Sequence, residues 1–439
     1  MSGNSGISGA SEASPYSRPG YRWYALGVLT LVYACHALDR GLPNILIEPV
    51  RHEFNLSDSQ LGLFSGMAFG VAFFLTGFPM GYLSDRVPNR RNMLALVVLA
   101  WSALTALGGF AKSFMHLIIV RFGLGAAEAG TAPLTMPMLS DIFPPHQRAT
   151  ALGIFYTSQP IGGFLATALG GYIAAEYGWR AAFFIAGIPG LIAAILVYTT
   201  LRDPRRGEMD EKPAENMGAA ENGGQIRMRD AFVFLRQNPA LLALMFGCAM
   251  LGLLSITLGA WVASFFMRVH NLGLAETGFI IGASAAFSSI TSPMAFGWLA
   301  DKLAPGDARW PLRLIWLASL GSMAFTMAQL FVPVLSVVVV CFILSEALRV
   351  GYAPPTYSVL LNRTPSNLRG SVMSLLQLFT ALMGFGVGPL LTGALSDYFG
   401  GGTAIKYAMA VVSILFVVAS ISLIVASRGL YGRKGGKPA

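Results

Sequence analysis

The sequence predicts an all-α membrane protein with twelve transmembrane helices, divided into two repeated halves of six. Composition is the first observation: of 439 residues, 54% are hydrophobic and 12% are charged. The second is that twelve stretches stay apolar for about 20 residues, which is the length that crosses a hydrocarbon layer about 30 Å thick. The third is a set of loop sequences that recur at fixed displacements. Because lipid cannot pair exposed backbone groups, every span is expected to be a helix.

The spans and the segments between them follow in order. The predicted spans lie near residues 22–46, 60–83, 92–111, 115–140, 149–174, 180–201, 239–266, 276–300, 311–331, 334–360, 370–395 and 404–427. The residues before the first span are polar and rich in Ser and Gly, so we expect a flexible tail rather than a signal peptide. A long polar stretch after span 6 is expected to be a linker. The predicted domains are a cytoplasmic tail at 1–21, an N-terminal bundle at 22–201, a cytoplasmic linker at 202–238, a C-terminal bundle at 239–427 and a cytoplasmic tail at 428–439.

The repeat is visible in loops, where chance similarity between apolar segments does not contribute. "LSDSQLGLF" (56–64) resembles "LGLAETGFI" (272–280), a displacement of 216 positions. The same displacement relates "GYLSDR" (81–86) to "GWLADK" (297–302), and a displacement of 221 relates "PPHQRATAL" (144–152) to "PSNLRGSVM" (365–373). The order is kept, so the two halves are predicted to be structural repeats.

Basic residues are distributed unevenly between the two sides of the predicted membrane. The net charge is +9, and 22 of the 30 Lys and Arg residues fall in segments on the side of the termini, against five in the opposite loops. This bias predicts a multi-pass protein of the plasma or inner membrane with both termini in the cytoplasm. It also accounts for the basic charge without nucleic acid, which we exclude as a partner.

Charged residues inside the spans are predicted to meet at one depth. Asp39 comes about 16 residues after Trp23 in span 1, roughly 24 Å along an outward-running helix. Arg121 comes about six residues after Met115 in span 4, roughly 9 Å down from the outer end. The two side chains therefore share a level in the outer half. Glu128 follows Arg121 by two turns on the same face, close to the middle of the membrane.

Buried charges of this kind cluster on transport paths, although a structural ion pair is the alternative. The candidates for function are Asp39, Arg40, Arg121 and Glu128. Glu346 and Arg349 in span 10 are three residues apart and can instead pair within their own helix. His36 lies one turn before Asp39 and either relays a proton or is simply packed. Pro133 and Pro354 coincide in the repeat and predict paired bends or tolerated kinks.

The loop "GYLSDRVPNRRN" after span 2 carries a motif that resembles the major facilitator superfamily. The matching residues are Gly81, Asp85, Arg86, Arg90 and Arg91, and the second copy keeps Gly297, Asp301 and Lys302. The second glycine of the family pattern is replaced within "VPN". The resemblance implies the major facilitator fold, two six-helix bundles related by a pseudo-twofold axis around a central cavity that opens alternately to each side. It also implies that the loop acids help to latch the halves, so the gating candidates are Asp85, Arg86, Arg91 and Asp301.

Further stretches resemble the Spinster-like branch, which includes carriers of lysophospholipids and sphingosine phosphate. They are "LDRGLPNI" (38–45), "GYLSDRVPNRR" (81–91), "RFGLGAAEAG" (121–130), "LSDIFPPHQR" (139–148) and "LRDPRRG" (201–207). The resemblance implies that Asp39 and Glu128 carry protons. The substrate-binding candidates are Arg40, Arg121, Glu128 and Arg349.

The sequence thus predicts a proton-coupled secondary active transporter that moves an amphipathic anionic, lipid-like substrate such as a lysophospholipid or sphingolipid. The alternative cargo is a small organic acid or a drug, because the buried arginines are balanced by acids and charge counting cannot choose. An enzyme or ATP-driven pump is not expected, since the sequence contains no P-loop, nucleophile elbow or metal-ligand spacing. We expect no cofactor other than the proton, membrane lipids as neighbours, and a monomer.

Overall fold

The computed structural model describes residues 15–209, 228–365 and 368–431 of the chain. Every regular element in these ranges is helical, which confirms the predicted fold class. The first 14 residues, linker residues 210–227 and tail residues 432–439 lie outside the described residues, so the predicted tails and linker are described only in part.

The N-terminal half contains spans 1 to 6. Its elements are η1 Pro15–Ser17, α1 Pro19–Ile45, α2 Ile47–Phe54, α3 Asp58–Gly62, η2 Leu63–Met67, α4 Ala68–Arg86, α5 Arg90–Gly108, α6 Phe114–Glu128, α7 Thr131–Ile142, α8 Pro145–Tyr156, α9 Ser158–Phe164, η3 Leu165–Leu169, α10 Gly170–Tyr177 and α11 Trp179–Thr200. The short helix α12, Met228–Gln237, follows before the second half.

The C-terminal half contains spans 7 to 12. Its elements are α13 Pro239–His270, α14 Leu274–Leu303, α15 Trp310–Phe331, α16 Leu335–Val350, α17 Ala353–Asn362, α18 Arg369–Ala381, η5 Leu382–Val387, α19 Gly388–Tyr398, η6 Gly402–Ala404, α20 Ile405–Ser413 and α21 Leu415–Tyr431. The segments η2, η3 and η5 are π-helical turns within spans 2, 5 and 11.

Ten helical stretches of the described chain are long and apolar enough to cross a membrane. The other two predicted spans, α1 and the α8–α10 stretch, are helical but are not among the ten. Asp39 and Arg40 in α1 lower its hydropathy, and the α8–α10 stretch is interrupted at Thr157.

Local sequence signals end and start the helices at repeated positions. Asn55 and Asn271 are the two described non-glycine residues with positive φ, at 51° and 55°, and they are displaced by the 216 positions of the repeat. Each ends a helix in the left-handed conformation that asparagine tolerates. Arg148 and Arg369, displaced by 221, each donate from Nε to two backbone carbonyl oxygens at the end of the preceding helix. The duplication predicted from the loop sequences is therefore also seen in the structure, because repeat-related residues form the same hydrogen bonds in both halves.

Spans 4 and 10 are both interrupted just before their prolines. The helix breaks between α6 and α7 at residues 129–130, and between α16 and α17 at residues 351–352. The interruptions stand where Pro133 and Pro354 predict a bend or a kink, because a proline nitrogen cannot donate to the preceding turn.

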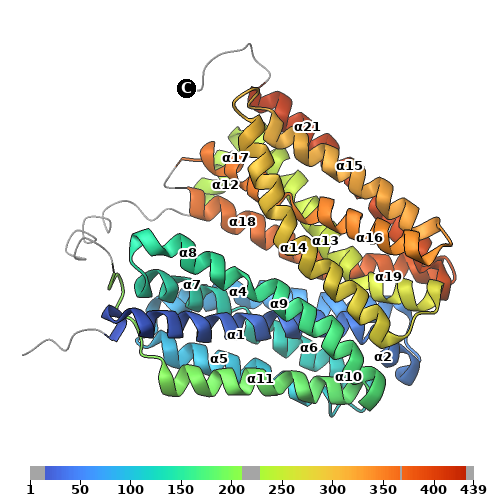
Figure 1. Cartoon of the computed structure of the whole chain (residues 1–439), viewed down its shortest axis with the longest axis horizontal. Helices are drawn as coiled ribbons and strands as arrows, with labels where there is room; N and C mark the ends of the chain where they lie inside the picture. The colour runs from blue at the N-terminus through green and yellow to red at the C-terminus, as the bar shows by residue number, and fades with distance from the viewer. Residues whose placement is uncertain (1–14, 210–227, 366–367, 432–439) are drawn as a thin grey trace, which may run out of the picture.

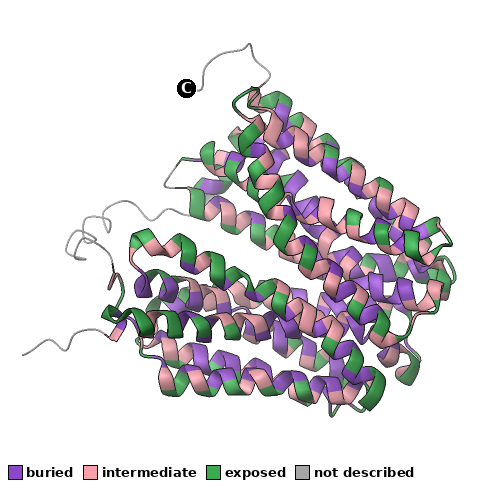
Figure 2. Cartoon of the chain, viewed as in Figure 1, coloured by how far each residue is buried: buried purple, intermediate pink, exposed green. Residues whose placement is uncertain are grey.

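The two halves converge at one end of the molecule and diverge at the other (Figure 1). We call the diverging end, which carries α12 and the ends of α1 and α21, the termini end, and the converging end the latch end. Two seams join the halves: in the first, α3, η2 and α4 contact η5 and α19, and in the second, η3, α9 and α10 contact α14. Buried residues fill the inside of each half and the latch end, while exposed residues line the outer helix faces (Figure 2).

Glycine lets the helices of the first seam approach closely. A Cβ atom on Gly62 would lie 2.5 Å from the carbonyl oxygen of Pro389 and 2.7 Å from Cα of Leu390, both backbone atoms. Gly66 and Gly70 face Phe385 and its neighbours in the same way. This backbone-to-backbone packing is typical of helix interfaces in membranes.

Candidate functional site

A buried cluster of charged and polar side chains lies between α1 and α6. Glu128 is the last residue of α6, and its Oε2 contacts two side chains of α1. Arg40 Nε lies 2.8 Å and His36 Nε2 lies 3.2 Å from this oxygen. The side chains of Glu128 and His36 are almost fully buried, whereas that of Arg40 is 24% exposed. Arg40 thus pairs with Glu128 rather than with its sequence neighbour Asp39, because successive helix residues point about 100° apart.

Aromatic rings from both halves surround the guanidinium of Arg40. Its Cζ lies 4.8 Å from the ring of Phe73, 5.2 Å from Phe69 and 5.5 Å from Phe385. Phe69 and Phe73 belong to α4, while Phe385 comes from η5 across the first seam. Cation–π contacts of this kind favour a charged guanidinium in a partly dry site. Arg40 is therefore the charged residue of this cluster that both contacts the other half and keeps access to solvent.

Arg121 is held by backbone rather than by an acid. Its Nε and Nη2 donate to the carbonyl oxygens of Phe64 and Ser65, both at 3.2 Å, inside the π-helical turn η2. A carbonyl oxygen has two lone pairs and can therefore accept from a side chain as well as from the backbone. The ring of Phe69 lies 5.0 Å from the guanidinium, so this ring is shared by Arg40 and Arg121.

Asp39 is 3% exposed and its Oδ1 has no hydrogen-bond partner among the described residues. Thr105 of α5, Arg121 and Glu128 are among the groups near it. The structure therefore brings all four predicted residues of spans 1 and 4 into one cluster, as the depth count predicted. A buried carboxyl group without a fixed cationic partner is suited to bind and release a proton. The roles assigned to these residues stay predictions.

Arg349 belongs to a separate cluster in the C-terminal half. It pairs with Glu346 on the same helix, α16, as the three-residue spacing predicted, and donates from Nη1 to the carbonyl oxygen of Leu254 at 3.3 Å. It is 4% exposed. Arg349 follows Glu128 by 221 positions, so the repeat places opposite charges at matching points of the two halves.

The predicted gating residues lie at the termini end, where the halves diverge. Asp85 and Asp301 are exposed, and neither forms an ion pair within the described parts of the chain. Arg86 stacks on the ring of Tyr82 at 3.7 Å. Arg91 donates from its backbone to Asp203 at 2.9 Å and from Nη1 to the carbonyl oxygen of Leu201 at 3.1 Å. In this conformation none of the four bridges the two halves, and their gating role remains a prediction.

Sequence reasoning missed the strongest ion pair of that end. Arg90 Nη2 lies 2.6 Å from Asp141 Oδ2 and also donates to the carbonyl oxygen of Pro204, while the second oxygen of Asp141 accepts from the backbone of Gly207. Arg90 and Asp141 are both buried. The pair ties the loop after span 2 to the end of span 4 and to the segment after span 6. The quoted motifs contain both residues, but their meeting depends on tertiary structure.

An ion-pair network at the latch end, which we call the latch, bridges the two halves. Its residues are Glu48, Asp58, Arg268 and Asp397. Arg268 of α13 lies 2.7 Å from Glu48 and 2.8 Å from Asp58, both in the N-terminal half. Asp397 of α19 accepts from the backbone N–H groups of Asp58 and Ser59 at 2.9 and 2.8 Å. A carboxylate of one half thus caps a helix N-terminus of the other, where the helix dipole favours negative charge.

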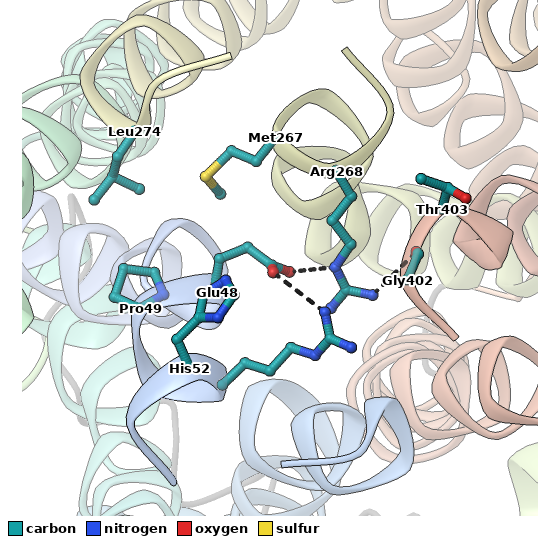
Figure 3. A pocket seen from close by; sticks show the side chains of 9 residues that line it. Glu48, Pro49, His52, Met267, Arg268, Leu274, Gly402 and Thr403 are labelled. Atoms are coloured by element: carbon teal, nitrogen blue, oxygen red, sulfur yellow. Dashed lines mark hydrogen bonds and ion pairs between the residues drawn. The ribbon is translucent and has the colours of Figure 1, made fainter. Parts of the chain in front are cut away.

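A pocket of about 470 Å³ lies against the latch. Figure 3 shows Arg268 at its wall, between Glu48 and Gly402. Arg51 is 3.8 Å from both Glu48 and Asp58, so it contributes more weakly than Arg268. Arg51 and Arg268 are two of the five basic residues that the sequence places in the loops opposite the termini. Nothing in the sequence shows that loops of different halves meet.

Glu53 and Arg180 form a second pair at the latch end, within the N-terminal half. Arg180 Nη1 donates to Glu53 at 2.7 Å, and the indole N–H of Trp179 donates to the same carboxylate at 2.6 Å. The hydrogen bond from Arg180 lowers the pKa of Glu53, and the opposing effect of burial does not reverse this. The carboxylate is therefore charged at neutral pH.

Two repeated helical halves with buried charge clusters and an inter-half latch at one end define a multi-pass membrane transporter, not an enzyme. A sequence profile of the Major Facilitator Superfamily matches residues 29–385, and the chain belongs to that family. It is therefore a secondary transporter that works by alternating access.

The relatives agree with the predicted branch. A crystal structure of a bacterial homolog to the human lysosomal transporter Spinster, in an inward-facing and unoccupied conformation, is 26% identical, covers 96% of this chain and 100% of its own, and superposes with a TM-score of 0.85. An MFS-type efflux pump of Mycolicibacterium smegmatis is 27% identical over 86% of this chain and 85% of its own. The sphingosine-1-phosphate transporter SPNS2 of Danio rerio is 25% identical over 58% of this chain and 52% of its own. The resemblance to Spinster-like proteins is confirmed.

Proposed function

We propose that the protein is a proton-coupled transporter of an amphipathic anion, with a lipid-like tail and an anionic headgroup. The observation that carries the proposal is the state of Arg40: it is partly exposed, flanked by rings of both halves, and paired with the buried Glu128. An anionic headgroup that binds Arg40 competes with Glu128 for the guanidinium. A buried carboxylate that loses its cationic partner is stable only in the protonated form.

In this scheme substrate and proton bind to adjacent groups. Headgroup capture by Arg40 leads Glu128 or Asp39 to take up a proton, and release of the headgroup reverses the exchange. A membrane potential of 100 mV supplies about 2.3 kcal/mol per charge moved, which drives transport without ATP. The name of the sphingosine-1-phosphate relative supports a lipid-like cargo with an anionic headgroup.

The orientation of the molecule follows from the charge bias of its loops. The basic residues gather at the termini end, so we infer that this end faces the cytoplasm of a plasma or inner membrane. The diverging halves then correspond to an inward-facing state, the conformation stated for the bacterial Spinster homolog.

Transport by purified protein in vesicles tests the coupling. Proteoliposomes with an entrapped pH dye receive a pH step with and without external lysophospholipid. We expect lysophospholipid to accelerate proton movement in wild type, and Asp39→Asn or Glu128→Gln to reduce the substrate-dependent rate at least tenfold. Glu176→Gln, an exposed glutamate of α10, is the matched control and keeps the wild-type rate. Equal proton movement with and without substrate, or wild-type rates in both variants, would refute coupling through this cluster.

A small organic acid or a drug is the second candidate cargo, favoured by the relative named as an efflux pump. Thermal stabilisation of the purified protein separates the cargoes. Lysolipids should raise the melting temperature of wild type but not of Arg40→Gln, whereas stabilisation by sugar acids or hydrophobic cations alone assigns the alternative.

A further inference from the structure

An apolar groove lies in the C-terminal half at the termini end, away from both charge clusters. It has a volume of about 670 Å³ and forms where α12, α13, α18 and α21 meet. Ten of its eleven lining residues are apolar. The exception is Ser422, whose hydroxyl already donates to the carbonyl oxygen of Ala243 at 2.8 Å. The groove therefore offers an occupant apolar contact and no free side-chain hydrogen-bonding group.

The depth of the groove along span 7 determines which part of the bilayer surrounds it. Span 7 begins at Pro239, and Leu242 and Phe246 lie in its first two turns, so the groove reaches roughly 10 Å into the membrane from the interface. Leu242 is 49% exposed, and Phe246 and Phe232 are also exposed. At this depth the medium that contacts these side chains is the hydrocarbon of the bilayer.

Helix α12 covers the interfacial end of the groove as an amphipathic helix. Its residues Ala231 and Leu235 are buried where α12 contacts α13 and α18, while Arg236 at its last turn is exposed. The side chain of Asn238 donates to the carbonyl oxygen of Phe234 at 2.8 Å and so fixes the corner between α12 and α13. Helices of this type lie in the plane of the headgroups.

Two exposed arginines flank the mouth of the groove. Arg236 precedes Pro239, a lining residue, by one turn. Arg428 is next to Gly429, which packs against Ala240 at the start of α13. The acidic residue of α12, Asp230, lies at the opposite end of that helix. Exposed basic side chains at headgroup level attract anionic lipids.

We propose that this groove is a binding site for an acyl chain of a bilayer phospholipid with an anionic headgroup, whose phosphate contacts Arg236 and Arg428. The acyl chain contacts α12, α13, α18 and α21 at the same time and so holds α12 against the bundle. The site is distinct from the transported substrate's, because none of its lining residues belongs to the clusters around Arg40 or Arg349.

Photolabelling of the full-length protein tests the site. The protein is placed in vesicles of three parts phosphatidylcholine and one part phosphatidylglycerol that contain a trace of phosphatidylglycerol with a photoreactive group in its acyl chain. After irradiation, labelled peptides are mapped. We expect the label to concentrate on α12 and the first turns of α13. Leu242→Trp fills the groove and should reduce that label at least fivefold. Leu317→Trp on α15, a leucine that is 47% exposed, is the matched control and should leave it unchanged.

Headgroup dependence is measured with a photoreactive phosphatidylcholine that carries the same acyl group. Phosphatidylglycerol should label the groove at least threefold more than phosphatidylcholine, and the double variant Arg236→Gln, Arg428→Gln should remove the difference. Arg206→Gln, at an exposed arginine in the segment after α11, should not. Label spread evenly over lipid-facing helices, or equal labelling in Leu242→Trp, would overturn the site. Displacement of the label by micromolar lysophospholipid would assign the groove to the cargo and overturn the bilayer-lipid assignment.

Discussion

Removal of the arginine in the latch should shift the transporter toward the state that is open at the latch end. Arg268→Met keeps most of the side-chain length but leaves Glu48 and Asp58 without their main partner. Loss of one member of a buried ion pair costs about 3 to 5 kcal/mol. Arg51 remains 3.8 Å from both acids and offsets part of this, so we expect about 3 kcal/mol. Because these contacts join the two halves only while the latch end is closed, the ratio of closed to open molecules should fall about 100-fold.

Distances between spin labels report this ratio. One label pair, Lys112→Cys with Pro333→Cys, spans the latch end, and another, His146→Cys with Asn362→Cys, spans the termini end. In Arg268→Met the first distance should lengthen and the second should shorten. Arg313→Met is the matched control, since Arg313 pairs at 2.9 Å with Asp307 in the same half and is partly exposed. Unchanged distance distributions in Arg268→Met, or the same shift in the control, would refute the idea that the latch holds this state.

Three other outcomes are expected. Gly62→Ala places a Cβ against the backbone of Pro389 and should open the latch end in the same distance assay, whereas Gly77→Ala on the same span has free space and should not. Arg90→Met leaves Asp141 buried without its cation and should lower the free energy of unfolding by about 3 kcal/mol, while Arg86→Met should change it by less than about 0.5 kcal/mol; thermal denaturation in detergent measures both. The pKa of Glu53 is lowered by Arg180, so the pair stabilises the fold above the usual glutamate pKa of 4.5 and this stabilisation is lost as the pH falls through the lowered value. Glu53→Gln should therefore lower the melting temperature slightly at pH 7, by an energy below about 1 kcal/mol, and match wild type near pH 3; an equal deficit at both pH values would contradict this.

The sequence was sufficient for the parts of the structure that depend on length and periodicity. Span length and loop repeats predict the helices, the two halves and the paired breaks before Pro133 and Pro354. Counting residues along spans 1 and 4 also placed Asp39 and Arg121 in one cluster, because rise per residue in a helix is nearly constant.

Side-chain partners and contacts between the halves could not be predicted in this way. The pairing of Arg40 with Glu128 depends on the rotation of α1 about its axis, which the depth count ignores. The latch joins Glu48 and Asp58 to Arg268, more than 200 positions later in the chain, and nothing local to these loops indicates that they meet. Asp85 and Asp301 show no contact across the halves because the end that carries them is the open one.

The π-helical turns follow the repeat only in part. Spans 5 and 11, which are repeats of each other, carry η3 and η5, whereas span 2 carries η2 and its repeat, span 8, has none. In the first seam both partners carry one, η2 and η5, whereas in the second seam η3 faces α14, which is a continuous α-helix. A π-turn holds an additional residue, so a helix can change its register there at low cost. The two seams between the halves therefore differ in how easily their helices can deform. In the first seam both helices can change register at a π-turn during the transport cycle. In the second seam α14 moves as one continuous helix. The rocking motion of the two halves is therefore expected to be asymmetric.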